Sequence, residues 1–256
     1  MDLLLTLQYD GTRYCGFQVQ KNGVSVCQVV QDGLESLLGT RPPVKGCGRT
    51  DAGVHALGYA LSLSADTRIP PEKFPLALNH HLPPDVRCTS ARLTPPDFHA
   101  RYSAHSKTYR YRIRCSAIDS PFDSAYCHRI SQKLDVPAMQ AAAAQFVGTH
   151  DFMALCSAGS SVAAKGDTVR TIYDCQVERS GAYVTITVSA NGYLYNMVRI
   201  LAGTLVQAGT GQLRPEQIPG ILQSRDRANA GPTLPAKGLF LVRVDYPELD
   251  APDKTT

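Results

Sequence analysis

The chain has no apolar run approaching the roughly 20 residues that a membrane-spanning helix needs. Its opening segment, MDLLLTLQYDG, lacks the basic flank, long apolar stretch and small-residue cleavage site of a signal peptide. Low-complexity segments and short-period repeats are also absent. We therefore expect a protein without a membrane partner. Its 256 residues, of which 43% are hydrophobic, can bury a sizeable core.

The eight cysteines include no CxxC pair and no Cys/His cluster with zinc-finger spacing. Cys88, Cys115 and Cys175 lie within predicted strands, where a thiol acts as a small apolar filler. Reduced cysteines of this kind are typical of a cytoplasmic protein.

Motifs that bind common cofactors are missing too. The sequence has no G-x-x-x-x-G-K-[ST] loop, no H-E-x-x-H helix and no G-x-G-x-x-G opening a helix. We therefore expect no metal, no nucleotide cofactor and no redox carrier. The net charge of +4 permits an RNA partner but does not demand one.

Hydrophobic periodicity predicts an α+β first half. Leucines alternate in Leu3–Gln8, which indicates a strand, and Val26–Leu38 places its apolar residues on one helical face. A short helix is expected at Pro71–His80, and further strands at Val44–Cys47, Leu57–Leu63 and Val86–Leu93. The order strand, helix, strand, strand, helix, strand is the ferredoxin-like βαββαβ pattern.

The same order returns after the prolines at 95 and 96, with one helix inserted. Strands are expected at Lys107–Cys115, Thr171–Glu178, Tyr183–Ala190 and Leu239–Tyr246, and helices at Val136–Val147, Tyr195–Ala208 and Pro215–Leu222. We expect two halves, 1–98 and 99–248, whose antiparallel sheets join into one central sheet with helices on one side. Residues 249–256 should form a loose tail, and Leu155–Asp167 a flexible loop.

The loop GCGRTDAGVHA, Gly46–Ala56, carries the strongest chemical signal. Its glycines allow tight turns and close approach to a ligand. Arg49 can meet phosphate, and Asp51 can attack electrophilic carbon. For the tripeptide D-A-G alone, a turn closed by the Asp51 side chain is the commoner explanation.

This loop resembles the catalytic motif of the tRNA pseudouridine synthase A (TruA) family. Five further blocks agree with that family in the family's order: YDGTRYCGFQVQ (Tyr9–Gln20), FHARYSAHSKTYRYRI (Phe98–Ile113), HDFMAL (His150–Leu155), SANGYLYNMVRILAGTL (Ser189–Leu205) and RANAGPTLPAKGLFLVRVDY (Arg227–Tyr246). The resemblance spans nearly the whole chain. It implies an enzyme that isomerises uridine to pseudouridine without a cofactor, because reactant and product have the same composition.

The resemblance also implies roles for single residues. Asp51 corresponds to the catalytic aspartate, Arg199 to the basic residue that pairs with it, and Tyr109 to the tyrosine that stacks on the uracil. The residues alone leave alternatives open. Arg199 could be an ordinary helix-surface arginine, and Tyr109 could be a core residue of its strand.

Substrate contacts are expected from basic and apolar side chains. Arg49 would hold open the gap that the extruded nucleotide leaves in the RNA. Lys107 and Arg110 lie in an acid-free basic stretch, which indicates phosphate contact or a solvated face. Either Leu239 or Phe240 would form the apolar wall behind the uracil base. Roles for Asp10, Tyr14 and Gln18 stay open.

The resemblance further implies a homodimer acting on positions 38, 39 and 40 of the tRNA anticodon arm. One position departs from the family. A glutamine often follows GVHA-x-G, whereas this chain has Tyr59. That change puts a contact at the start of the strand in doubt, not the chemistry.

Overall fold

The computed structural model describes residues 1–21, 23–159 and 164–250. Its strands are β1 (Asp2–Tyr9), β2 (Val44–Gly46), β3 (His55–Ser64), β4 (Val86–Leu93), β5 (Ser106–Cys115), β6 (His128–Ile130), β7 (Gly148–Asp151), β8 (Val169–Ser180), β9 (Tyr183–Ala190) and β10 (Leu239–Asp245). Its α-helices are α1 (Val26–Leu38), α2 (Phe74–Asn79), α3 (Val136–Ala144), α5 (Met197–Gly209), α6 (Ile218–Ser224) and α7 (Pro247–Asp250). Short 3₁₀ helices are η1 (Gly11–Arg13), η2 (Met153–Leu155), η3 (Pro215–Gln217), η4 (Arg227–Asn229) and η5 (Ala236–Gly238).

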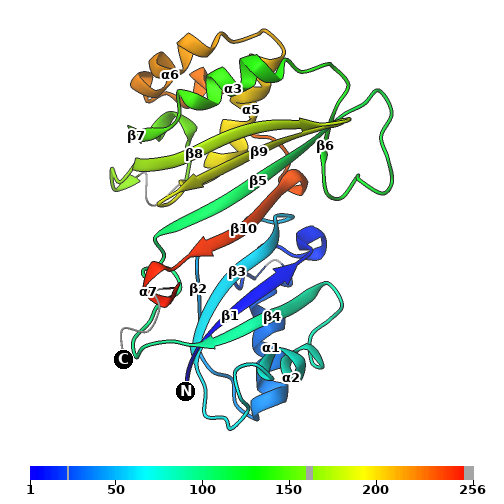
Figure 1. The fold of residues 1–256 in the computed structure, drawn as a ribbon, viewed down its shortest axis with the longest axis vertical. Helices are drawn as coiled ribbons and strands as arrows, with labels where there is room; N and C mark the ends of the chain where they lie inside the picture. The colour runs from blue at the N-terminus through cyan, green and yellow to red at the C-terminus, as the bar shows by residue number, and fades with distance from the viewer. Residues whose placement is uncertain (22, 160–163, 251–256) are drawn as a thin grey trace. The chain divides into compact units, whose positions relative to one another are not determined.

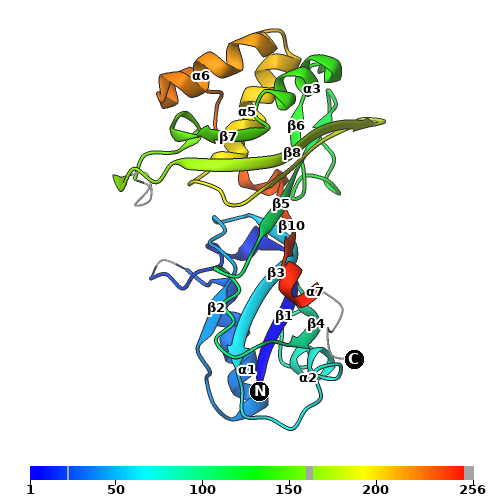
Figure 2. The same ribbon diagram turned by 60° about the vertical axis from the view of Figure 1, so that its left-hand side comes forward.

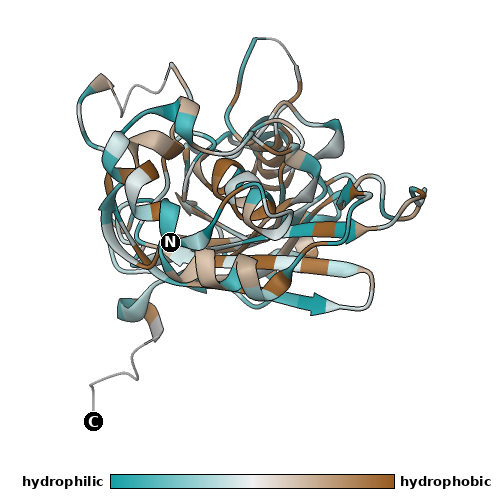
Figure 3. Cartoon of the chain, turned by 90° about the horizontal axis from the view of Figure 1, so that it is seen from above, coloured by the Kyte–Doolittle hydropathy of each residue, from teal (hydrophilic) through white to brown (hydrophobic). Residues whose placement is uncertain are grey.

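The described strands form one 10-stranded sheet, which confirms the predicted α+β class with a single sheet. Its path is β4-β1-β3-β10-β5-β9-β8-β7, with β2 paired to β3 and β6 paired to β5. Figure 3 shows hydrophobic and hydrophilic residues following one another along the strands, as expected for strands whose two faces differ.

The chain packs as two compact units. The first contains Met1–Lys107 and the chain from Leu241 on, and the second contains Thr108–Phe240. These bounds differ from the expected halves because most of β10, from Leu241 on, belongs to the first unit. There its backbone approaches β3 so closely that a Cβ on Gly58 would lie 2.4 Å from the Val242 carbonyl oxygen.

The first unit has the ferredoxin-like strand order. β1 lies between β3 and β4, antiparallel to both, and β2 is antiparallel to β3. α1 begins at the cap Ser25, whose side chain accepts a hydrogen bond from the Gln28 amide, and ends at Gly39 in a left-handed conformation. α1 and α2 cover one face of these strands (Figures 1 and 2).

Both faces of this first sheet region are buried. Leu3, Leu5 and Leu7 share one face of β1 and are inaccessible to solvent. On the other face, Leu4 pairs in register with Ser62, and the backbone amide of Ala100 donates to the Ser62 hydroxyl at 3.0 Å. The turn around Ala100 therefore covers the face that the helices leave open.

The second unit repeats the pattern. β5, β8 and β9 alternate with α3 and α5, and the predicted hairpin at Gly181 joins β8 to β9 with Ser180 opposite Tyr183. α3 packs on β8 and on α5. In Figure 1, α3, α5 and α6 lie on one side of β8 and β9.

Several element boundaries differ from those expected. α5 begins at Met197 rather than Tyr195, because Asn196 adopts a left-handed conformation with φ 60°. The helix expected from Pro215 divides into η3 and α6. The strands β6 and β7 were not predicted, because three or four residues carry too little periodicity to detect.

Two expectations concern segments that the structure describes only in part. Leu249 and Asp250, expected in a loose tail, end the helix α7, and the rest of that tail lies outside the described residues. Residues 160–163 of the expected flexible loop also lie outside them.

Candidate active site

The loop that joins β2 to β3 alternates buried and accessible residues before Asp51. Cys47 and Thr50 are buried, whereas Arg49 between them is exposed and Asp51 is half-buried. The backbone amide of Val54 donates to the Asp51 carbonyl at 3.2 Å and closes the turn. The loop thus presents a guanidinium and a carboxylate two residues apart.

The segment Gly11–Phe17, which precedes α1, packs against this turn and is called the cradle below. The Phe17 amide donates to the Thr50 carbonyl at 3.2 Å, and the Gly53 amide donates to the Tyr14 carbonyl at 3.3 Å. A Cβ on Gly16, which has φ 106°, would lie 2.4 Å from the Thr50 carbonyl oxygen. A Cβ on Gly11 would lie 2.0 Å from the Val54 carbonyl oxygen. Only glycine fits at these two points of contact.

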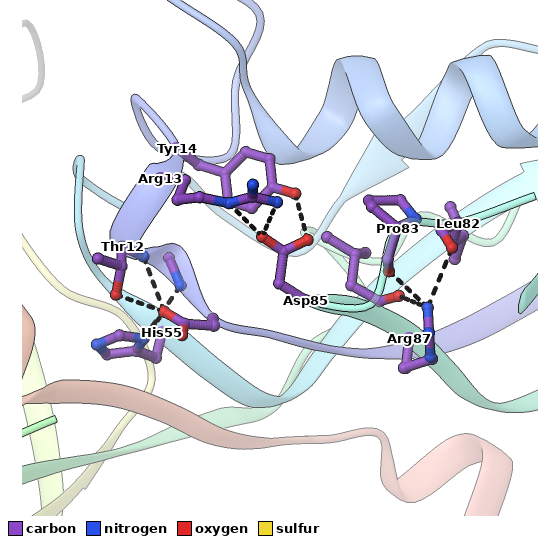
Figure 4. A network of polar contacts seen from close by, with 11 residues as sticks. Thr12, Arg13, Tyr14, His55, Leu82, Pro83, Asp85 and Arg87 are labelled. Carbon is purple, nitrogen blue, oxygen red and sulfur yellow. Dashed lines mark hydrogen bonds and ion pairs between the residues drawn. The ribbon is translucent and has the colours of Figure 1, made fainter. Parts of the chain in front are cut away.

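His55, which directly follows the turn, connects it to the start of the cradle (Figure 4). Its side chain is buried, and its Nδ1 accepts the Gly11 amide hydrogen at 3.0 Å. Asp10 Oδ1 lies 3.2 Å from the same Nδ1. Asp10 Oδ1 also accepts the Thr12 amide at 2.9 Å.

A second polar group anchors the cradle to the start of β4. Asp85 accepts hydrogen bonds from Arg13 Nε at 2.9 Å and from the Tyr14 hydroxyl at 2.8 Å, as Figure 4 shows. Burial, followed by the neighbouring Asp85, raises the pKa of Tyr14 to about 12. Tyr14 therefore acts as a hydrogen-bond donor and not as a proton acceptor at neutral pH. The third residue of open role, Gln18, is exposed.

Two buried phenols support the loop on either side of Arg49. The Tyr59 hydroxyl donates to the Gly48 carbonyl at 2.6 Å, and the Tyr9 hydroxyl shares a hydrogen bond of 2.9 Å with the Thr50 hydroxyl. Tyr59 also stacks on Phe17, with ring centroids 4.0 Å apart. The residue that departs from the family pattern thus supports the loop directly.

We expect Tyr59→Phe to lower the rate of catalysis without unfolding the protein. The variant removes one hydroxyl and leaves the Gly48 carbonyl without its donor, a loss of about 1 kcal/mol in stability. It also frees the backbone next to Arg49, so the single-turnover rate should fall about tenfold, because small misplacements are costly in catalysis. Tyr183→Phe, which removes a hydrogen bond to Asp123 in the other unit, is the control. Equal rates for the two variants would contradict the prediction.

Lys107 lies beneath the same loop. Its Nζ would be 3.6 Å from a Cβ placed on Gly48. Burial lowers the pKa of Lys107, and the nearby Arg101 lowers it further. Burial also raises the pKa of the Cys47 thiol to about 11, so Cys47 is neutral and does not compete with Asp51 as a nucleophile.

In the second unit, Tyr109 lies on β5 with 9% of its surface exposed. Its ring meets that of Tyr193 edge to face, with centroids 5.1 Å apart. The Tyr193 hydroxyl donates to the Val188 carbonyl at 2.9 Å, and burial raises its pKa well above the ordinary value. Tyr193 therefore holds the Tyr109 ring in one orientation.

Arg199 lies in the first turn of α5 and is half-buried. Its Nε donates to the Leu234 carbonyl at 2.6 Å, and the Leu234 amide donates back to the Arg199 carbonyl at 3.3 Å. The Arg199 Nη1 donates to the Asn196 Oδ1 at 2.8 Å. These contacts fix the orientation of the guanidinium. An ordinary solvated surface arginine requires no such contacts.

The closing segment of the chain is held against α5. A Cβ on Gly203 would lie 1.9 Å from the Pro232 carbonyl oxygen, and the Gly231 amide donates to the Thr204 hydroxyl at 2.9 Å. Leu234 is thereby fixed as the acceptor for Arg199. Leu239 and Phe240, the alternatives for the wall behind the base, are exposed by only 6% and 7%.

The basic side chains of β5 have different roles. Arg110 is half-buried, and its Nε is a buried atom with no hydrogen-bond partner among the described residues. Arg112 lies over the rings of Tyr183 and Phe240, 5.8 Å and 5.9 Å from their centroids. Arg114 donates to the Ile118 carbonyl at 3.0 Å and contacts Asp123, which makes it structural.

Sequence reasoning missed the supporting residues. Asp85 lies 71 positions after Tyr14, and nothing in PPDVR indicates that pairing. Tyr9 and Tyr59 resemble ordinary strand residues. The alternation of β1 and β3 could have revealed that both face the loop, but only with the strand register known.

A family model described as tRNA pseudouridine synthase matches residues 6–103 and 142–247. The chain belongs to the tRNA pseudouridine synthase family. It is therefore an isomerase that converts uridine to pseudouridine in tRNA. The matched segments contain Asp51, Arg49 and Arg199, whereas Tyr109, Lys107 and Arg110 lie between them.

Curated relatives named tRNA pseudouridine synthase A are similar over nearly their whole length. The protein of Thermoanaerobacter sp. (strain X514) is 42% identical over 245 residues, covering 96% of this chain and 99% of its own. That of Ruminiclostridium cellulolyticum is 46% identical, covering 94% and 98%. That of Shouchella clausii is 46% identical, covering 94% and 91%. None of the helices in the described part of this synthase is long and apolar enough to cross a bilayer.

Proposed function

We propose that this synthase isomerises uridines at positions 38, 39 and 40 of the tRNA anticodon stem-loop, with Asp51 as the catalytic carboxylate. The observation that carries the proposal is the loop itself. Asp51 lies in a turn cradled by Gly11 and Gly16, with the exposed Arg49 two residues before it. A half-buried carboxylate held in this way is accessible to a nucleoside and fixed in position.

Arg49 acts first. A uridine within the stem cannot present its glycosidic bond to a side chain, so the nucleotide leaves the stack, at a cost of a few kcal/mol. The exposed Arg49 enters the gap and stabilises the extruded form. Lys107 and Arg110 contact the RNA backbone. The Arg110 Nε, which has no hydrogen-bond partner in the described part of the chain, supports this role.

Asp51 then starts the exchange of one bond for another. The bond from ribose to uracil nitrogen breaks, the base rotates, and a carbon-carbon bond forms from ribose to carbon 5. Carbon 5 loses its proton and the ring nitrogen gains one, so composition is unchanged and no co-reactant is needed. The Arg199 guanidinium pairs with the Asp51 carboxylate. Tyr109 stacks on the uracil, and Leu239 walls the base.

One aspartate reaches three adjacent positions only if the protein reads the shape and backbone of the tRNA more than its bases. We propose that it acts in the cytoplasm as a homodimer in which each tRNA contacts both subunits. Because backbone contacts dominate, binding should weaken steeply with salt.

The test is pseudouridine mapping on an unmodified tRNA transcript, using a chemical label because the product has the mass of the substrate. We expect label at positions 38 to 40 after incubation with the protein alone, and equal label in the presence of a chelator. Release of free uracil would instead show hydrolysis, and binding without conversion would show an RNA-binding module. Label confined to other uridines would refute the assigned positions.

A further inference from the structure

The turn that follows β4 in the first unit is hydrogen-bonded to the core through Ala100. Ala100 is fully buried. Its amide donates to the Ser62 hydroxyl at 3.0 Å, and its carbonyl accepts from the Tyr246 hydroxyl at 2.6 Å. Both partners are themselves buried, with exposures of 3% and 1%. The middle of the turn therefore has a fixed position.

His99 fixes the rest of the turn from within. Its carbonyl accepts the amides of Tyr102 at 3.0 Å and of Ser103 at 2.9 Å. Its ring Nδ1 accepts the Arg101 amide at 3.1 Å, so Nδ1 carries no proton. The turn is thus ordered by its own hydrogen bonds as well as by the core.

This ordered turn presents an aromatic ring to solvent. Tyr102 is 75% exposed. The His99 ring lies 4.4 Å from its centroid at an interplanar angle of 50°, and the Arg101 guanidinium carbon lies 5.6 Å from it. An exposed ring beside a cation is the arrangement on which proteins stack the bases of single-stranded nucleic acid.

The turn Phe98–Ser103 carries the cation Arg101 and no acid, and Asp97 directly precedes it. Burial lowers the pKa of His99, and the charges of Lys45 and Arg101 lower it further. Arg101 also acts on Lys107, whose Nζ lies beside Gly48 of the Asp51 loop. Arg101 and Lys107 thus belong to the same unit as the catalytic loop.

We propose that the turn Phe98–Ser103 is a second RNA contact, in which an unpaired base of the tRNA stacks on Tyr102 while Arg101 contacts a phosphate. The proposal rests on the proposed function, since it names a further contact for the same substrate. An exposed tyrosine beside a cation suits a polyanion with aromatic bases better than the apolar surface of a protein partner.

The test compares dissociation constants for an unmodified tRNA transcript. Tyr102→Leu keeps an apolar side chain but removes the aromatic face, and should weaken binding about tenfold, the usual loss for one stacked base. Tyr102→Phe should restore binding, because it restores the ring. Tyr173→Leu, which alters a 45% exposed tyrosine on β8, is the matched control and should leave binding unchanged.

The cations are tested by salt dependence. Arg101→Met should lower the slope of log K against log salt by about 1, the value for one lost phosphate contact. Unchanged binding by Tyr102→Leu, or equal losses for Leu and Phe, would overturn the proposal. If the unaltered protein binds tRNA but converts no uridine, the proposed function fails while this contact stands. If it converts uridine and Tyr102→Leu binds normally, only this contact fails.

Discussion

Asp51→Asn should abolish conversion of uridine in an unmodified tRNA transcript while leaving tRNA binding intact. The amide keeps the shape of the carboxylate but can neither attack carbon nor accept a proton. We expect the single-turnover rate to fall by more than about 10³-fold, within the range for removing a catalytic acid-base group. The turn is closed by the backbone bond from Val54 to Asp51, which asparagine retains, so the protein should fold normally.

The control for this variant is Asp32→Asn. Asp32 lies on α1 in the same unit and pairs with Arg41 at 2.6 Å, with both side chains well exposed. Exposed pairs contribute little to stability, about 0 to 1 kcal/mol, so this change should alter neither rate nor binding. Conversion retained by Asp51→Asn would refute the assigned mechanism. Loss of tRNA binding in parallel with conversion would show that Asp51 acts in recognition.

The fold was predictable because both units repeat one local pattern. Alternation at Leu3, Leu5 and Leu7 and helical spacing in Val26–Leu38 arise from burial on one face, which sequence records directly. The return of β10 to the first unit could not be predicted in this way. It depends on the close approach of Gly58 to Val242, a contact between residues far apart in the chain.

In the candidate site, too, some residues could be predicted from the sequence and others could not. Asp51, Arg49 and Arg199 could be named because they belong to motifs that resemble a family. The residues that support them could not be named, because Tyr59, Asp85 and Leu234 act through hydrogen bonds to distant parts of the chain. A strand tyrosine that packs and a strand tyrosine that holds a catalytic loop have the same periodicity. Only the register of β3 distinguishes them.

Gly11→Ala should cause the second-largest loss of activity, although Gly11 takes no part in the chemistry. The added Cβ would lie 2.0 Å from the Val54 carbonyl oxygen and 2.6 Å from its carbon. Backbone atoms cannot move aside as a side-chain end can, so the turn from Asp51 to Val54 must shift. A displacement of about 1 Å at a catalytic group can cost 10²-fold in rate, which is the loss we expect at saturating tRNA.

Stability separates this effect from unfolding. Crowding in a packed region costs about 1 to 3 kcal/mol, so Gly11→Ala should remain folded, with a lowered denaturant midpoint. Gly220→Ala is the control, because a Cβ there has no neighbour within 4 Å. It lies within α6 and should stabilise the protein by about 0.5 to 1 kcal/mol without changing the rate. A Gly11→Ala protein that is destabilised but fully active per folded molecule would show that the cradle supports folding and does not position Asp51.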